Sequence, residues 1–229
     1  MSRAVFQPSF EGLPGALPIF PLAGVLLLPG GQLPLNVFEP RYLAMVRDAL
    51  AGSRLIGMIQ PALPAGAGGD VDELGDIGAA PVYETGCAGR ITAYSETDDG
   101  RNLITLTGVI RFDVARELPC AAEGYRLVEP RYDRFRHDLE SDEAAIDRAG
   151  LLDALEGYFG ATGIEGDWSA IEEADDEPLV TSLAMLCPFA APEKQALLEA
   201  MTLPERAATM TTIMAMAAHQ HGDAPPAPQ

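Results

Sequence analysis

LPIFPLAGVLLLPGGQLPLNVFEPRY, residues 17–42, is the stretch that decides the fold. Prolines interrupt it at positions 18, 21, 29, 34 and 40, and each one removes a backbone donor and clashes with a preceding helical turn. A regular helix is therefore excluded before Pro40. The apolar runs Val25–Leu28 and Leu33–Val37 flank the turn signal Pro29-Gly30-Gly31, so we predict a hairpin of short extended segments.

Pro40 marks the change from extended segments to a helix. A proline in the first helical turn costs nothing, because the N–H that it lacks has no partner there. Apolar residues then recur at helical spacing until Gly52 ends the pattern: Tyr42, Leu43, Val46, Ala49 and Leu50. The sequence predicts one early amphipathic helix directly after the hairpin.

Strand patterns dominate from residue 54 to residue 132. Residues 54–60 form an apolar run ended by Pro61, which predicts a buried strand. We also predict strands over 81–94 and 125–132. The turn signal Asp98-Asp99-Gly100 predicts a hairpin that leads into the longest strand pattern.

This longest pattern has a period of two. Its apolar side chains occupy even positions: Ile104, Leu106, Ile110, Phe112 and Val114. Arg111 belongs to the opposed polar series, so we expect a half-buried strand with Arg111 on its polar face. Gly108 indicates a bend within this strand.

After residue 134, alanine, leucine and methionine replace proline and β-branched residues. We predict helices that start near Ser141, near Asp167, at Pro192 and at Leu203. Strands followed by helices indicate an α+β protein rather than a doubly wound sheet. The predicted organisation is an arm over 1–16, a β domain over 17–133, a helical bundle over 134–218 and a disordered tail over 219–229.

Composition and charge narrow the range of functions. The three cysteines, Cys87, Cys120 and Cys187, are odd in number and far apart, which favours reduced thiols in the cytoplasm over a disulfide framework. We find no signal peptide and no run of roughly 20 apolar residues, so we expect a soluble protein without a membrane partner. The net charge of −19 repels phosphate backbones and argues against nucleic acid as a partner.

The negative charge is concentrated in the second half of the chain. Residues 1–135 hold 11 basic and 16 acidic side chains, whereas residues 136–229 hold 4 and 18. The densest acidic run is Glu172–Glu177. Its simplest interpretation is a solvated surface that keeps the protein soluble, and weak attraction of divalent ions is the alternative.

Patterns typical of catalysis are missing. Lys194 is the only lysine, and no glycine-rich loop precedes it, which excludes a P-loop ATPase. Lys194 lies in the first turn of a predicted helix, where we expect an exposed side chain rather than the base of a Ser-Lys protease. His137 lies in a charged linker, and His219 and His221 lie near the chain end, so no catalytic triad is predicted.

Metal ligands are only weakly indicated. Asp70 and Asp72, followed by Gly75, are similar to the start of a calcium loop, but Pro81 stands where that loop needs a glutamate. The glycine-rich segment beside them is followed by acids, which a phosphate site would not tolerate. We therefore expect no metal and no cofactor.

Several motifs together resemble the N-terminal, substrate-binding domain of Lon proteases. The box Phe38-Glu39-Pro40-Arg41-Tyr42 ends the first predicted hairpin, as it does in that family. The strand 54–60, the segment Tyr83–Ile91 and the segment Leu106–Phe112 follow in the family's order, with Thr85 and an extra glycine departing from its pattern. These motifs cover roughly residues 17–132.

The resemblance implies a PUA-like pseudo-barrel of strands, a helical bundle after it, and a role in binding polypeptides. The ATPase and Ser-Lys peptidase of the full protease are absent from this sequence, so the resemblance points to a standalone bacterial version without catalysis. The expected partners are unfolded or client polypeptides. The candidate contact residues, each of which also suits a core position, are Phe38, Tyr42, Tyr83 and Phe112.

Two alternatives stay open at this point. One is a peptidase-related hydrolase with an unrecognised nucleophile, such as Ser182 or Cys187, that acts with a separate ATPase or protease partner. The other is an adaptor whose acidic helical half docks on a basic surface of such a partner.

Glu39 and Arg41 of the box have a structural interpretation. No nucleophile or metal ligand accompanies them in the sequence. We expect them to form an ion pair that fixes the strand-to-helix corner, with Phe38 and Tyr42 packed beneath it.

Overall fold

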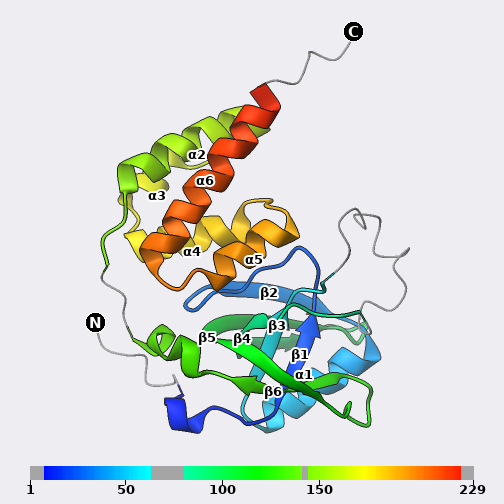
Figure 1. The fold of residues 1–229 in the computed structure, drawn as a ribbon. Coiled ribbons are helices and arrows are strands. Elements are labelled where there is room, and N and C mark those ends of the chain that lie inside the picture. The colour runs from blue at the N-terminus through cyan, green and yellow to red at the C-terminus, as the bar shows by residue number, and fades with distance from the viewer. Residues whose placement is uncertain (1–7, 63–79, 141–143, 223–229) are drawn as a thin grey trace. The chain divides into compact units, whose positions relative to one another are not determined.

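The computed structural model describes residues 8–62, 80–140 and 144–222 (Figure 1). Internal contacts divide the chain into two compact units, one that ends at Ser141 and one that starts at Asp142. Strands precede helices, so the predicted α+β class is confirmed. The elements of the first unit are η1 (Phe10–Gly12), β1 (Leu17–Pro21), β2 (Gln32–Val37), α1 (Pro40–Ala51), β3 (Leu55–Ile59), β4 (Thr85–Glu96), β5 (Asn102–Leu118), β6 (Arg126–Arg131) and η3 (Asp133–Leu139).

The strands of the first unit form one sheet in the order β2-β5-β4-β3-β1-β6. β1 runs parallel to β3, and every other neighbouring pair is antiparallel. One side of the long strand β5 pairs first with β2 and then with β6, while its other side pairs with β4. The β5–β6 pairing closes five strands into the predicted pseudo-barrel and leaves β2 as an edge strand.

The predicted hairpin within residues 17–42 is wrong. β1 pairs with β3 and β6, whereas β2 pairs with β5, so the two segments are not neighbours. The apolar run 25–28 is not a strand but a mostly buried connection. The turn after it is confirmed, because Gly31 donates its N–H to the Leu28 carbonyl over 3.0 Å and Gly30 has a φ of 77°. Proline followed by a glycine with positive φ is the pattern of a type II turn.

This turn packs directly on the backbone of β5. The N–H of Gly30 donates to the carbonyl of Gly108 at 3.0 Å, and the N–H of Gly108 donates to the carbonyl of Gly31 at 2.9 Å. A Cβ at position 108 would lie 2.0 Å from the carbonyl oxygen of Leu28. Gly108 is therefore required by the close approach of two backbones, which a bend alone does not explain.

The core of the barrel forms around Phe112. Gly57 in β3 and Gly86 in β4 leave room for its ring, since a Cβ at either position would lie within 2.9 Å of the ring atom Cζ. Helix α1 covers β1 through Tyr42, whose ring centroid lies 4.2 Å from that of Phe20. Two glycines thus make the space that the Phe112 ring fills in the core.

Arg111 is buried, although the period of β5 predicted it on the polar face. Its side chain is 1% exposed and bonds the Asp138 carboxylate of η3, with Nη2 2.7 Å from Oδ1 and Nε 2.9 Å from Oδ2. The backbone N–H of Arg111 donates to the same carboxylate at 2.9 Å, and the Phe135 ring lies against the guanidinium. The bidentate partner replaces the water that burial removes. It lies 27 residues later, outside the local pattern.

The same ion pair moves the boundary between the units. Because η3 packs on β5, it belongs with the sheet, and the division falls after residue 141 rather than after residue 133. At the other end of the unit, the described part of the predicted arm contains η1. The carbonyl of Pro14 there accepts a hydrogen bond from the Tyr132 hydroxyl at 3.3 Å.

The second unit is helical, as predicted. Its helices among residues 144–222 are α2 (Arg148–Thr162), α3 (Trp168–Glu173), α4 (Asp176–Leu186), α5 (Ala191–Glu199) and α6 (Leu203–Gly222). α2 packs along α6, which also contacts α4 and α5. Within the described residues, no helix is long and apolar enough to cross a membrane.

Two helix limits differ from their predictions. α2 begins at Arg148, because the carboxylate of Asp147 caps it by accepting the Gly150 N–H at 3.1 Å. The predicted cap at Ser141 lies outside the described residues. α6 continues to Gly222, so it includes the first residues of the predicted tail, and the remainder of that tail lies outside the described residues.

Candidate functional site

The aromatic residues predicted as contacts do not share one surface. Phe112 and Tyr42 are buried in the core of the first unit, so neither can touch a ligand in this structure. Tyr83, just before β4, is half-buried. Phe38 is 64% exposed and is the member of the set with an open surface. Two of the four residues predicted to contact a partner, Phe112 and Tyr42, are therefore core residues instead.

The box at the start of α1 forms the expected ion pair. Nη2 and Nε of Arg41 lie 2.8 and 3.0 Å from Oε2 of Glu39, and the guanidinium lies 4.8 Å from the Tyr42 ring centroid. Glu39 immediately precedes the helix, so the pair holds the strand-to-helix corner. Phe38 does not pack beneath it. Val37 takes the buried position, and the next side chain along a strand points to the other face.

A shallow depression of about 450 Å³ lies on β2, β4 and β5, and Phe38 is not among its lining residues. Leu103 and Tyr94 contribute partly exposed apolar surface to it. The edge strand β2 carries Pro34, which lacks an N–H, and a proline on an edge opposes the addition of another strand. This surface is poorly suited to main-chain recognition of an extended segment.

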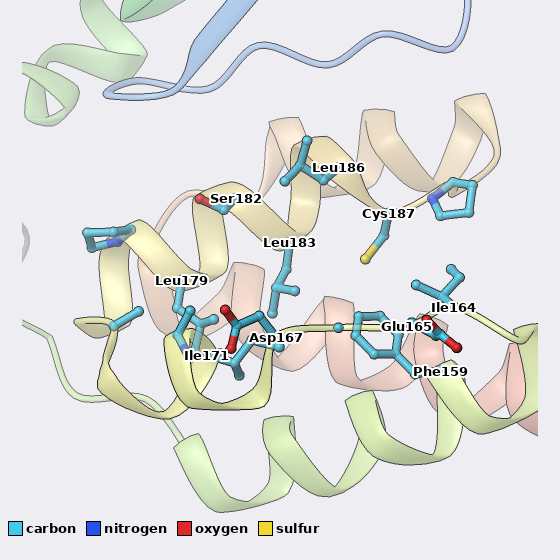
Figure 2. Close-up of a pocket in the computed structure, with 15 residues that line it drawn as sticks. Phe159, Ile164, Glu165, Asp167, Ile171, Leu179, Ser182, Leu183, Leu186 and Cys187 are labelled. Atoms are coloured by element: carbon cyan, nitrogen blue, oxygen red, sulfur yellow. Dashed lines mark hydrogen bonds between the residues drawn. The ribbon is translucent and has the colours of Figure 1, made fainter.

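An apolar groove with a volume of about 430 Å³ lies in the second unit (Figure 2). The end of α2, the following loop, α3 and α4 form it. Buried side chains such as Leu179 and Leu183 make its floor, whereas Leu186 at its rim is 82% exposed. Its lining residues are Phe159, Ile164, Glu165, Gly166, Asp167, Ala170, Ile171, Ala174, Pro178, Leu179, Ser182, Leu183, Leu186, Cys187 and Pro188.

Two glycines shape the loop along one side of the groove. Gly163 ends α2 in the left-handed conformation, with a φ of 71°. Gly166 lets the chain pass close to Phe159, since a Cβ there would lie 2.5 Å from the ring atom Cε2. The ring of Trp168 then packs edge-on against Phe159 at a centroid distance of 5.9 Å. The loop is thus held against the end of α2 by ring packing.

Arg148 of α2 holds α3 and α4 in place around the groove. Its Nη1 lies 2.6 Å from Oδ1 of Asp176 at the start of α4. Its Nη2 donates to the carbonyls of Ile171 and Glu172 at 2.9 and 3.0 Å. Carbonyls at a helix end have no partner within the helix, so a cation there satisfies them. The groove is therefore preformed by a charged clamp.

The lining residues that could act as nucleophiles are not activated. Burial raises the pKa of the Cys187 thiol to about 11, so it is protonated at neutral pH and a poor nucleophile. Ser182 is exposed at the groove, but the fifteen lining residues include no histidine, lysine or arginine to serve as its base. The groove offers apolar contact rather than covalent chemistry.

Lys194 is 6% exposed, which contradicts the predicted surface lysine. The packing of α5 against α4 and α6 turns its first turn inward, and burial lowers the pKa of the ammonium. His137 lies in η3, where its Nε2 is 3.1 Å from Nη2 of the buried Arg111, while its own side chain is 40% exposed. The described residues contain no group of three or more acids, histidines or cysteines placed to hold a metal. The pair Asp70 and Asp72 lies outside them.

No local sequence pattern predicted this groove, because no single segment contains it. Its walls come from three helices and one loop, and each helix shows only an ordinary apolar stripe. One local feature could have indicated it. Ile164, Ile171 and Leu186 are large apolar residues outside the buried core, and the first two stand among acids.

Comparison with known proteins identifies relatives for most of the chain. The family model for the substrate-binding domain of ATP-dependent protease La (LON) matches residues 16–216. The Lon protease of Anaeromyxobacter dehalogenans is 29% identical over 139 residues, which are 59% of this chain and 15% of that protein. Lon protease 2 of Myxococcus xanthus is 26% identical over 141 residues, or 62% and 16% of the two chains. The chain thus spans about a sixth of the length of these curated relatives.

Solved structures share the fold. A Lon N-terminal domain protein from Xanthomonas campestris matches with a TM-score of 0.58 and 24% identity, covering 86% of this chain and 97% of that one. The N-terminal domain of a Mycobacterium avium complex Lon protease matches with the same TM-score and 14% identity, covering 87% and 97%. At these identities the likeness speaks for the fold alone.

Proposed function

The chain belongs to the family of Lon substrate-binding domains, and from this premise we propose that it binds unfolded segments of client polypeptides without catalysis. The apolar groove of the second unit is the proposed contact surface. Unfolded chains expose the apolar side chains that folded proteins bury, and burying such side chains against the groove favours binding.

The observation that carries this proposal is the preformed groove itself. Its volume of about 430 Å³ lies within the range typical of ligand-binding pockets and can accommodate a few apolar side chains. Leu186 stands at its rim with 82% exposure, so it offers apolar surface to a partner. The clamp at Arg148 means that little ordering is needed on binding, which lowers the entropic cost.

The hydrolase alternative has less support. It requires an activated nucleophile, and the two residues considered for that role lack one feature each. Burial raises the pKa of the Cys187 thiol, and no basic side chain lines the groove beside Ser182. A binding function requires only apolar contacts, and the groove provides them.

Fluorescence anisotropy with a labelled, permanently unfolded protein tests the proposal. Leu186→Ser removes apolar surface at the groove and should weaken binding about five- to tenfold, as expected for roughly 1 kcal/mol of lost contact. Met216→Ser is the matched control, because Met216 is 57% exposed on α6 and does not line the groove. Absence of binding by the unaltered protein, or equal weakening by both substitutions, would overturn the proposal.

A further inference from the structure

The charged residues of the second unit are separated by sign. Residues 144–222 contain 13 acidic and 3 basic side chains. Ten of the acids are exposed and none is buried. Lys194 and Arg206 are buried, and Arg148 is engaged in its clamp. The surface that this unit presents to a partner is therefore almost entirely negative.

The two cations besides Arg148 face the interior. Nε of Arg206 donates to the Leu197 carbonyl at 2.9 Å, and its Nη2 donates to the Ala200 carbonyl at 3.3 Å. Lys194 in α5 is buried near Cys187, which directly follows α4. Arg206 thus satisfies carbonyls at the end of α5, and neither cation stands on the surface that a partner would meet.

Negative side chains also stand at the groove. Glu165 and Asp167 belong to its lining and are exposed. The carboxylate of Asp167 accepts the Ala170 N–H at 3.2 Å and the Ser169 hydroxyl at 3.0 Å, and these hydrogen bonds hold it at the rim and lower its pKa. Four further acids stand between lining residues in the sequence of α3 and the start of α4 without lining the groove themselves: Glu172, Glu173, Asp175 and Glu177. The apolar groove thus carries two exposed carboxylates, those of Glu165 and Asp167.

We propose that the groove selects apolar segments that are flanked by lysine or arginine, an inference that rests on the proposed function. The apolar side chains of such a segment fill the groove, and its cations reach the carboxylates around it. The long aliphatic stems of lysine and arginine can cover apolar surface while their charges stay in water beside the acids. Complementary charge also speeds the encounter and rejects acidic segments.

The charge distribution also argues against a second copy of this chain as the occupant. A copy would bring the same acidic unit to the groove, and the whole chain carries a net charge of −19. Like charges brought together across an interface cost free energy and disfavour association. A cationic, apolar segment of another polypeptide satisfies both the floor and the border.

Three labelled peptides with one shared apolar core test the inference by anisotropy. Their flanks carry lysine, serine or glutamate, and nothing else differs. We expect the lysine-flanked peptide to bind about tenfold more tightly than the serine-flanked one, and the glutamate-flanked one to bind most weakly. Added salt should shrink these differences, because exposed charges are screened.

A matched pair of variants places the effect at the groove. Glu165→Gln should weaken binding of the lysine-flanked peptide about two- to threefold and leave the serine-flanked one unchanged. Asp153→Asn removes an equal charge from an exposed position of α2 that does not line the groove, and should change neither. Equal effects of both substitutions on the lysine-flanked peptide would overturn the inference.

The outcomes separate this inference from the function beneath it. If all three peptides bind equally and Leu186→Ser weakens each of them, the groove binds apolar segments and the preference for cations is wrong. If no peptide binds, both the proposed function and the preference for cationic flanks are wrong. Tighter binding of the glutamate-flanked peptide would reverse the inference.

Discussion

The two units use their charges in different ways. In the described part of the first unit, residues 8–62 and 80–140, 11 basic side chains accompany 14 acids. Several of them pair across strands, as Arg116 does with Glu129 and Arg126 with Glu117. In residues 144–222, 3 basic side chains accompany 13 acids. The first unit uses charge to fasten its sheet, whereas the second leaves most of its negative charge for solvent or a partner.

The two units also differ in how deeply their long-range ion pairs are buried. Arg111 in the first unit depends on Asp138, and the turn at Gly30 depends on Gly108. Arg148 in the second unit pairs with Asp176 over a similar distance in the sequence, but these two side chains are 28% and 36% exposed, against 1% and 4% for Arg111 and Asp138. We therefore expect single substitutions to disturb the first unit more than the second. Trp168, the only tryptophan, reports on the second unit alone.

The largest effect is expected from Asp138→Ala. It leaves the Arg111 guanidinium buried without its partner, which typically costs about 3–5 kcal/mol of unfolding free energy. Urea unfolding measures this loss when it is monitored by the hydrogen exchange of the backbone amides in β5. The fluorescence of Trp168 should change much less. If both probes shift equally, the units unfold as one and the comparison between them fails.

Glu129→Ala is the control for Asp138→Ala. It breaks the exposed ion pair with Arg116 in the same sheet. Exposed pairs contribute about 0–1 kcal/mol, because water and salt screen them. A loss as large as that of Asp138→Ala would show that burial is not what makes the Arg111 pair costly to break.

The next largest difference between the two units is expected in the reactivity of their cysteine thiols. The pKa of Cys187 rises from 9.0 to about 11 through burial, which lowers its thiolate fraction at neutral pH roughly 100-fold. Cys120 in the first unit is exposed. In a thiol-disulfide exchange assay at pH 8, Cys120 should react at once and Cys187 at least 100-fold more slowly. Fast reaction of both thiols in the Cys87→Ala background would show that α4 opens readily.

Replacing one chosen glycine of each unit by alanine should change the stability of the two units in opposite directions. Gly108→Ala forces a Cβ against the Leu28 carbonyl and should destabilise the first unit by about 1–3 kcal/mol or more. Gly157 lies in the middle of α2 with open space around its Cβ position. Gly157→Ala should stabilise the second unit by about 0.5–1 kcal/mol. Thermal unfolding of both variants measures the two shifts, and shifts of equal sign would contradict the contrast.

The smallest effect is expected from Arg41→Ala. Two donors of Arg41 share one oxygen of Glu39 and the pair is partly exposed, so its loss should cost about 0.5–1 kcal/mol. Thermal unfolding measures the cost. Binding of an unfolded polypeptide at a permissive temperature should persist, because the box lies outside the groove. Loss of binding without loss of stability would instead make the box the recognition site.

Local patterns predicted most elements and few of the contacts between them. Alternation in residues 104–114 and the proline at position 40 correctly indicated β5 and α1. The hairpin within residues 17–42 was wrong because turn residues specify a change of direction but not which strand becomes the neighbour. The groove was missed for a similar reason, since its residues are ordinary within each helix.

The sequence by itself determined the kind of most segments, because proline, glycine and hydrophobic period act on the backbone within a few residues. It also determined the excess of negative charge after residue 135. Only the tertiary structure decided that Arg111 and Lys194 are buried. Burying a charge depends on partners and packing supplied by distant segments, and no local pattern contains them. The same holds for the apolar groove, which exists only once α2, α3 and α4 are assembled.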